Sequence, residues 1–140
     1  PALALTCPPR TTEDLFTAHQ EQSENYVMAY GAITPVGKRP QLNPDTLEHE
    51  PAGPYSAVFS GLLARPSGFD LPARFAITVE ERCLGPWCGV LPINGPTVIF
   101  LRKVNNGYRL ETDACNHTVL TGPIDRELEV LIGCLRKGTC

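Results

Sequence analysis

The chain has 140 residues, of which 42% are hydrophobic and 19% are charged, and its net charge is −3 at pH 7. This length predicts one domain with a sizeable core, because a chain of about 150 residues buries roughly 68–70% of its unfolded surface. The negative charge offers no electrostatic attraction for nucleic-acid phosphates or anionic membranes. No apolar run approaches the roughly 20 residues of a membrane-spanning helix.

The N-terminal arm, residues 1–6, is apolar and contains the triplet Ala2-Leu3-Ala4. Because this pattern precedes signal-peptidase cleavage, the arm is either the remnant of a signal peptide or a plain apolar extension. Residues 7–140 are predicted to form a single domain. Pro8 and Pro9 open it with an extended segment.

Helical and strand patterns follow in turn. Thr11 to Asp14 has the form of a capping box, which predicts a short helix over 12–20. Runs of apolar, β-branched and aromatic residues predict strands over 26–33, 55–64, 73–82, 97–104 and 108–113. The proline-rich segment 35–54 predicts a long exposed loop, and Asn106-Gly107 is a type I′ hairpin signal.

The last predicted element is an amphipathic helix over 123–136. Its apolar residues fall on one helical face; they are Ile124, Leu128, Leu131, Ile132 and Leu135. Five strands with a helix at each end and mostly short connections predict a mainly β fold, built on a small closed barrel.

The chain has an even number of cysteines, and no pair has the two-residue gap of a zinc knuckle or a dithiol redox site. They are Cys7, Cys83, Cys88, Cys115, Cys134 and Cys140. This pattern indicates structural disulfides, and therefore an oxidising compartment: secreted, cell-surface or periplasmic.

No catalytic signature appears in the sequence. Trp87-Cys88-Gly89 resembles part of a thioredoxin-type site, but Leu91 stands where the second cysteine would be, so a structural bridge covered by Trp87 is expected. The three histidines are too far apart in the sequence to predict a metal site; they are His19, His49 and His117. No serine has the setting of a nucleophile elbow. We therefore expect no enzyme activity, no metal and no cofactor.

The charged residues predict neither a catalytic site nor a nucleic-acid site. Glu80 and Glu81 are adjacent on a predicted strand, so they point to opposite faces and cannot act as an acid–base pair. Arg102, Lys103 and Arg109 cluster across the predicted hairpin, where a solvated face is favoured over a nucleic-acid site.

Several short motifs, taken in order, resemble the netrin-like module, the fold of the N-terminal domain of the tissue inhibitors of metalloproteinases. They are Cys7-Pro8-Pro9 followed by Phe16, a strand opening at Tyr26, Cys88-Gly89, the strand Val98-Ile99-Phe100-Leu101, Asp113-Ala114-Cys115-Asn116, and a terminal amphipathic helix that carries a cysteine. The resemblance extends from Cys7 to Cys140. It implies an OB-type, five-stranded Greek-key barrel with helices packed beside it.

The resemblance also implies a disulfide pattern. It pairs Cys7 with Cys115 and leaves Cys83 as partner for Cys88 and Cys134 as partner for Cys140. The short separations within the last two pairs agree with this set, because a turn can bring each pair within bonding distance.

The family's inhibitors chelate zinc through the amine and carbonyl of an earlier cysteine, whose place Leu5 occupies here. The resemblance therefore predicts a secreted or periplasmic domain that binds an extracellular or envelope protein without catalysis. A candidate partner-binding ridge comprises Leu5, Thr6, Cys7, Pro8, Pro9 and Trp87. The alternative is that the arm only stabilises the barrel, to which the implied disulfide of Cys7 joins it. Two other functions stay open: a small-ligand or glycan-binding module, and a metalloproteinase inhibitor, with a protease as partner, that acts without the usual chelation.

Overall fold

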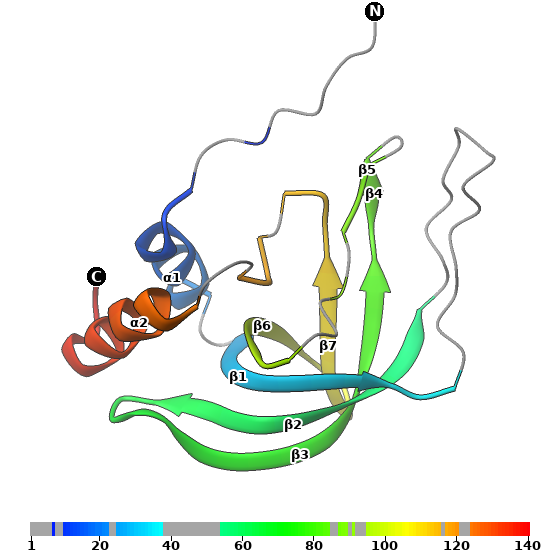
Figure 1. Ribbon diagram of the computed structural model, residues 1–140, viewed down its shortest axis with the longest axis horizontal. Coiled ribbons are helices and arrows are strands. Elements are labelled where there is room, and N and C mark those ends of the chain that lie inside the picture. The colour runs from blue at the N-terminus through cyan, green and yellow to red at the C-terminus, as the bar shows by residue number, and fades with distance from the viewer. Residues whose placement is uncertain are drawn as a thin grey trace, which may run out of the picture.

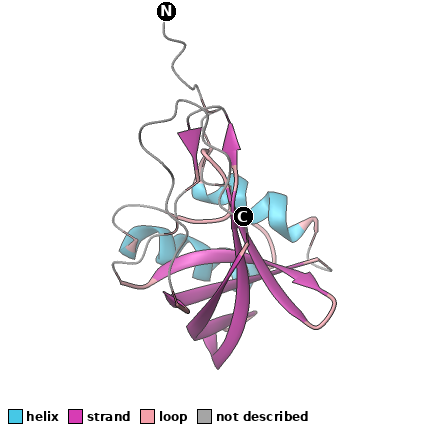
Figure 2. Cartoon of the chain, turned by 90° about the vertical axis from the view of Figure 1, so that its right-hand side faces the viewer, coloured by secondary structure: helices cyan, strands magenta, loops and turns pink. Residues whose placement is uncertain are grey.

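The chain folds as a closed five-stranded barrel with two helices beside it (Figure 1). The computed structural model describes residues 7, 10–22, 25–37, 54–84, 87–89, 91, 95–115, 117–120 and 124–140. In chain order the elements are α1 (Thr12–Gln20), β1 (Tyr26–Pro35), β2 (Tyr55–Arg65), β3 (Gly68–Glu81), β4 (Cys83–Leu84), β5 (Trp87–Cys88), β6 (Thr97–Val104), β7 (Gly107–Thr112) and α2 (Asp125–Lys137). Seen from the side, both helices lie outside the barrel (Figure 2).

The barrel has the order β1-β2-β3-β7-β6, and β6 pairs again with β1 to close it. All neighbouring strands are antiparallel except β3 and β7, which run parallel over 78–81 and 109–112. The mainly β fold is therefore confirmed as a Greek-key barrel of the OB type, with one helix before the strands and one after them.

The barrel interior holds the first of two apolar cores. In β2, buried Tyr55, Ala57 and Phe59 alternate with exposed Ser56 and Ser60, which is the pattern of a strand with one face inward. Residues from every barrel strand join this cluster, among them Ile33, Ile77, Val79, Ile99, Leu101 and Leu110.

The second core lies between the barrel and the helices. Val98 and Phe100 of β6 point outward from the barrel but are buried, because α1 and α2 cover that face with residues such as Phe16 and Leu131. β6 is thus buried on both faces, which explains why its sequence is a continuous apolar run and not an alternating one.

The helix boundaries follow from their caps. Thr11 and Asp14 form the predicted capping box, with reciprocal side-chain to backbone distances of 3.1 Å. α2 runs from Asp125 to Lys137, two residues later at its start and one at its end than predicted, and Gly138 ends it with φ of 77°. A left-handed residue is a common helix terminator, and glycine adopts it without strain.

The strand boundaries differ from the predicted ones by at most two residues, except at the start of β3. β3 begins at Gly68 and not at 73, so it includes Pro72. Proline is tolerated there because β3 pairs with β7 only from Thr78 onward, which leaves the neighbouring edge free of ladder bonds. The β6–β7 loop is Asn105-Asn106, since Val104 pairs with Gly107, and only Asn106 has the positive φ that a type I′ turn needs at both positions.

Most of the predicted loop at 35–54 lies outside the described residues, which omit 38–53. The segment before β6, predicted as an irregular crossing, contains the two-stranded β4–β5 sheet, which the sequence pattern missed. Two-residue strands carry too little periodicity to be recognised from sequence.

Candidate functional site

The β4–β5 hairpin projects from the barrel at the end remote from the helices (Figure 1). Cys83 pairs with Cys88 across the ladder, and a disulfide joins them with a Cα separation of 3.9 Å. Trp87 stands opposite Leu84 in the same register. This sheet therefore presents Trp87 on a covalently closed hairpin.

Backbone contacts hold the hairpin against the chain that leaves β7. The amide of Arg82 donates to the carbonyl of Thr112 at 2.8 Å, and the amide of Gly89 donates to the carbonyl of Arg82 at 2.9 Å. A Cβ at Gly89 would lie 2.3 Å from the amide nitrogen of Asp113. Only glycine permits this approach, so the Cys-Gly pair serves to seat the hairpin on the barrel.

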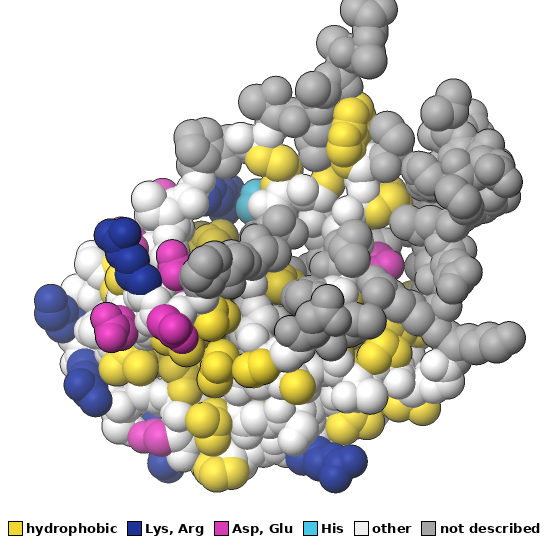
Figure 3. All heavy atoms as spheres, viewed as in Figure 1, with side chains coloured by type: hydrophobic (Ala, Val, Ile, Leu, Met, Phe, Trp, Pro, Cys, Tyr) yellow, Lys and Arg dark blue, Asp and Glu magenta, His cyan; other side chains and the backbone are white. Residues whose placement is uncertain are grey.

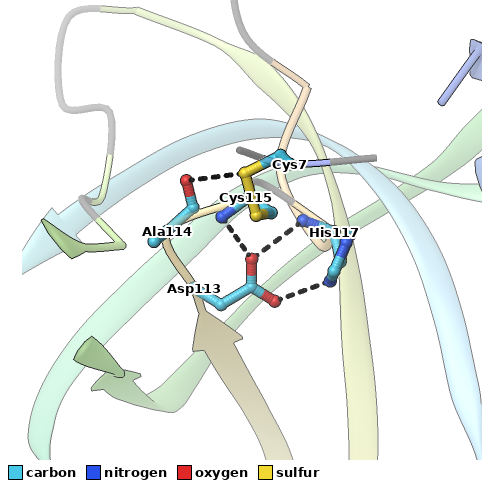
Figure 4. Close-up of a disulfide and its surroundings, with 5 residues drawn as sticks. All are labelled: Cys7, Asp113, Ala114, Cys115 and His117. Atoms are coloured by element: carbon cyan, nitrogen blue, oxygen red, sulfur yellow. Dashed lines mark hydrogen bonds and ion pairs between the residues drawn. A yellow bond between two sulfur atoms is a disulfide. The ribbon is translucent and has the colours of Figure 1, made fainter. Parts of the chain in front are cut away.

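A second disulfide lies beside this junction. Cys7 is bonded to Cys115 with a Cα separation of 5.5 Å, and it contacts the carbonyl oxygen of Ala114 at 3.8 Å (Figure 4). Asp113 Oδ1 accepts from the amide of Cys115 at 2.9 Å and from that of His117 at 3.4 Å. The imidazole Nδ1 of His117 donates to Asp113 Oδ2 at 3.0 Å. Asp113 therefore orders the turn that carries Cys115.

We call the surface formed by Cys7–Cys115, Cys83–Cys88 and Trp87 the disulfide end. Trp87 is 39% exposed there, and Figure 3 shows hydrophobic side chains at this end of the molecule. Of the predicted ridge, the structure brings Cys7 and Trp87 to the same end. The other members lie outside the described residues; they are Leu5, Thr6, Pro8 and Pro9.

The third disulfide joins Cys134 in the last turns of α2 to Cys140, with a Cα separation of 4.6 Å. The three bonds are the pairs that the resemblance implies. They are compatible with a domain stabilised in an oxidising, extracellular compartment.

Histidines and acidic residues of the described segments form no group of three or more that could hold a metal ion. The thiol of Cys115 is consumed in its disulfide, and the neighbouring His117 is engaged by Asp113. His19 packs on the helix side, where its ring stacks on Phe100 with centroids 3.9 Å apart and Nδ1 donates to the carbonyl of Leu15 at 2.8 Å.

Glu80 and Glu81 point to opposite faces of β3, as their spacing predicts. Glu81 is buried and accepts a 2.8 Å hydrogen bond from the Tyr55 hydroxyl. Glu80 lies outside and accepts from Arg109, whose guanidinium lowers the pKa of that carboxyl although partial burial opposes the shift. The two carboxylates therefore serve separate contacts and share no reaction centre.

The predicted cluster of cations is balanced by acidic neighbours that were not predicted. Arg102 lies 2.7 Å from Glu111, and Arg82 bridges Glu111 and Glu80. Glu80 and Glu111 are neighbours in the parallel β3–β7 ladder. Both glutamates could be seen on predicted strands, but no pattern in the sequence indicates that these two distant strands pair. This face is an ion-paired network, which does not favour a nucleic-acid groove.

Within the described residues, neither helix has the length and apolar character needed to cross a membrane. The geometry at the disulfide end thus provides a fixed, partly apolar surface and no constellation of reactive groups among the residues placed there. Comparisons of the chain with models of protein families, with curated proteins and with solved structures gave no match.

Proposed function

We propose that the chain is a netrin-like, disulfide-stabilised extracellular or periplasmic domain that binds a protein partner through its disulfide end and catalyses no reaction. The observation that carries the proposal is the exposure of Trp87 on a hairpin closed by Cys83–Cys88 and seated on the barrel through Gly89. Tryptophan is enriched among the residues that dominate binding energy at protein interfaces.

Pre-organisation supports this role. Association costs free energy when side chains and loops become ordered, and a crosslinked surface has already lost that freedom. Trp87 is adjacent to Cys88, whose disulfide closes the hairpin, and Gly89 at the hairpin base contacts Asp113, two positions before the disulfide-bonded Cys115. A partner that covers Trp87 therefore buries a large apolar ring at low conformational cost.

Zinc chelation of the inhibitor type is not part of the proposal. In that family the first cysteine supplies the chelating amine and carbonyl, and Leu5 occupies its place here. The proposal therefore rests on contact between surfaces, with no metal ligand supplied by the arm.

The test is site-specific photo-crosslinking of the oxidised full chain. A photoreactive amino acid replaces Trp87 in one sample and Leu71, an equally exposed residue of the β2–β3 hairpin, in the other. Incubation with secreted or envelope proteins of the source organism is expected to give one discrete adduct from position 87 and none from 71. The partner should be recovered with unchanged mass, as a non-catalytic contact requires.

Affinity for the purified partner then quantifies the contact. Trp87→Ala is expected to weaken binding by about 30-fold or more, the effect of losing a hot spot of about 2 kcal/mol, and Leu71→Ala by less than about 2-fold. Equal adduct yields from the two positions, or equal affinities of the two alanine variants, would remove the disulfide end as the binding surface.

A further inference from the structure

A hollow of about 150 Å³ lies between the helices and the barrel. Its walls are mostly apolar and come from α1, β1, β2, β6 and α2; they include Phe16, Tyr26, Met28, Ala64, Phe100 and Leu135. An apolar cavity of this volume holds a hydrocarbon about the size of benzene. This inner hollow is therefore suited to an apolar group.

A second, outer hollow of about 380 Å³ adjoins it. Phe16, Ala64 and Leu135 line both, so the two form one continuous groove that opens between the end of α2 and the β2–β3 turn. The combined space falls in the range of roughly 300–1,000 Å³ that is typical of small-ligand sites.

Basic side chains border the outer hollow. Arg65, Arg136 and Lys137 line it, and none of the described residues in its walls is acidic. Figure 3 shows Lys and Arg side chains along the edge where α2 and the β2–β3 turn lie, with acidic side chains nearby. The groove thus combines an apolar inner part with a cationic mouth.

The three cations are not equally available. Arg65 is committed to Asp70, with its Nε 2.6 Å from the carboxylate. Lys137 also borders a separate hollow that contains Glu13 and Glu129. Arg136 is exposed and forms no ion pair with any residue that the structure describes. Arg136 is therefore the cation best placed to receive an anionic group.

We propose that this groove binds a medium-chain alkyl carboxylate, with its hydrocarbon tail in the inner hollow and its carboxylate at Arg136. The inner walls match the tail, and the guanidinium fork matches a carboxylate in geometry and charge. His19 also lines the inner hollow, where its ring stacks on Phe100 and its Nδ1 is engaged by the Leu15 carbonyl. The site is separate from the disulfide end, so this inference stands independently of the proposed partner.

Decanoate is the probe, titrated into the oxidised full chain below its micellar concentration and followed by amide chemical shifts. Saturable shifts confined to the groove are expected, with a dissociation constant on the order of 0.1–1 mM for a ligand of this size. Decyltrimethylammonium, which has the same tail and the opposite charge, is expected to bind at least several-fold more weakly.

Two pairs of variants locate the site. Ala64→Leu fills the wall shared by both hollows and should weaken decanoate binding by about 10-fold or more, since the added side chain occupies the space of the tail. Ala76→Leu is the matched control, because Ala76 is exposed and lies six rungs away along the β2–β3 ladder, about 20 Å.

The second pair tests the charge. Arg136→Gln should weaken decanoate binding by about 2- to 5-fold, the range of an exposed ion pair, and leave decyltrimethylammonium binding no weaker. Arg74→Gln removes an exposed arginine outside the groove and should change neither. Because Arg136 and Arg74 are both exposed, these two variants also test the proposal if Ala64→Leu fails to fold.

Shifts that are not saturable or spread over the whole molecule would overturn the proposal, because they indicate surfactant adsorption. Equal dissociation constants for decanoate and decyltrimethylammonium would overturn the proposed role of Arg136. Full binding by a folded Ala64→Leu variant would place the tail elsewhere.

Discussion

The two sides of this barrel are held by different forces. At the disulfide end, covalent bonds fix segments that remain half-buried or exposed, including Cys83, Cys88 and Trp87. On the helix side, Leu131 and Phe100 are almost fully buried and fix the helices through apolar packing. Packing orders a surface by removing it from solvent, whereas a crosslink orders a surface and leaves it accessible.

This difference explains why the proposed protein contact and the proposed ligand groove have different characters. Trp87 needs rigidity without burial, and two nearby disulfides provide it. The groove needs an apolar interior, which the helix-side core provides around Phe16 and Leu135.

The largest expected effect comes from breaking the long-range crosslink. Cys7→Ser with Cys115→Ser opens a bond that spans 108 residues. The chain-entropy model assigns a loop of this length about 4–5 kcal/mol, so the free energy of unfolding should fall by that amount. Urea denaturation followed by far-ultraviolet circular dichroism measures it.

The short crosslink provides the comparison. Cys83→Ser with Cys88→Ser opens a bond across only five positions, for which the same model gives about 2 kcal/mol. Equal losses in the two double variants would show that loop entropy is not what these disulfides contribute.

The next effect tests the packed side. Leu131→Ala removes a side chain that is 0% exposed in the helix-side core, and such truncations cost about 2–5 kcal/mol through lost burial and the cavity left behind. Leu71→Ala is the matched control, since Leu71 is 40% exposed and its loss should change stability by less than about 0.5 kcal/mol. Similar losses in both would contradict the assignment of Leu131 to the core.

The smallest effect is a pH dependence on the helix side. Burial lowers the pKa of His19 below its ordinary value of 6.5, the hydrogen bond to Leu15 opposes this shift, and the charges of Arg10 and His117 add to it. The unfolded chain therefore takes up this proton first as pH falls below about 6.5, so the free energy of unfolding should decrease toward lower pH. The stability that the neutral ring contributes is fully present above pH 6.5.

Denaturant titrations between pH 7.5 and 5 measure that slope. His19→Gln removes the titrating ring, so its slope over this interval should be shallower than that of the parent chain. A steeper or unchanged slope in the variant would assign the pH dependence to other groups.

Much of the fold could be predicted because its elements have strong local signals. The capping box at Thr11 and Asp14 fixed the start of α1, and one-face periodicity identified α2 around Leu131. The apolar run at 97–104 predicted β6 with the bounds that the structure has. The β3 start at Gly68 was missed because Pro72 is unfavourable in most strands and is acceptable only on an unpaired edge.

The candidate site could be predicted only in part. The resemblance placed Cys7 near Cys115 and Cys83 near Cys88, and the candidate ridge included Trp87. It did not predict that Gly89 would seat the hairpin on Asp113, a contact between segments more than 20 positions apart. The groove was not predicted either, because its lining comes from five elements that are distant in the sequence.

By itself, the sequence determined the order and type of most elements and the cysteines available for crosslinking. These features depend on neighbouring residues, whose propensities and periodicity act over a few positions. Only the tertiary structure decided the parallel β3–β7 closure, the pairing of Glu80 and Glu111 with arginines of three segments, and the juxtaposition of both hollows. These features depend on which distant segments meet when the two cores are buried, and no local pattern specifies that choice.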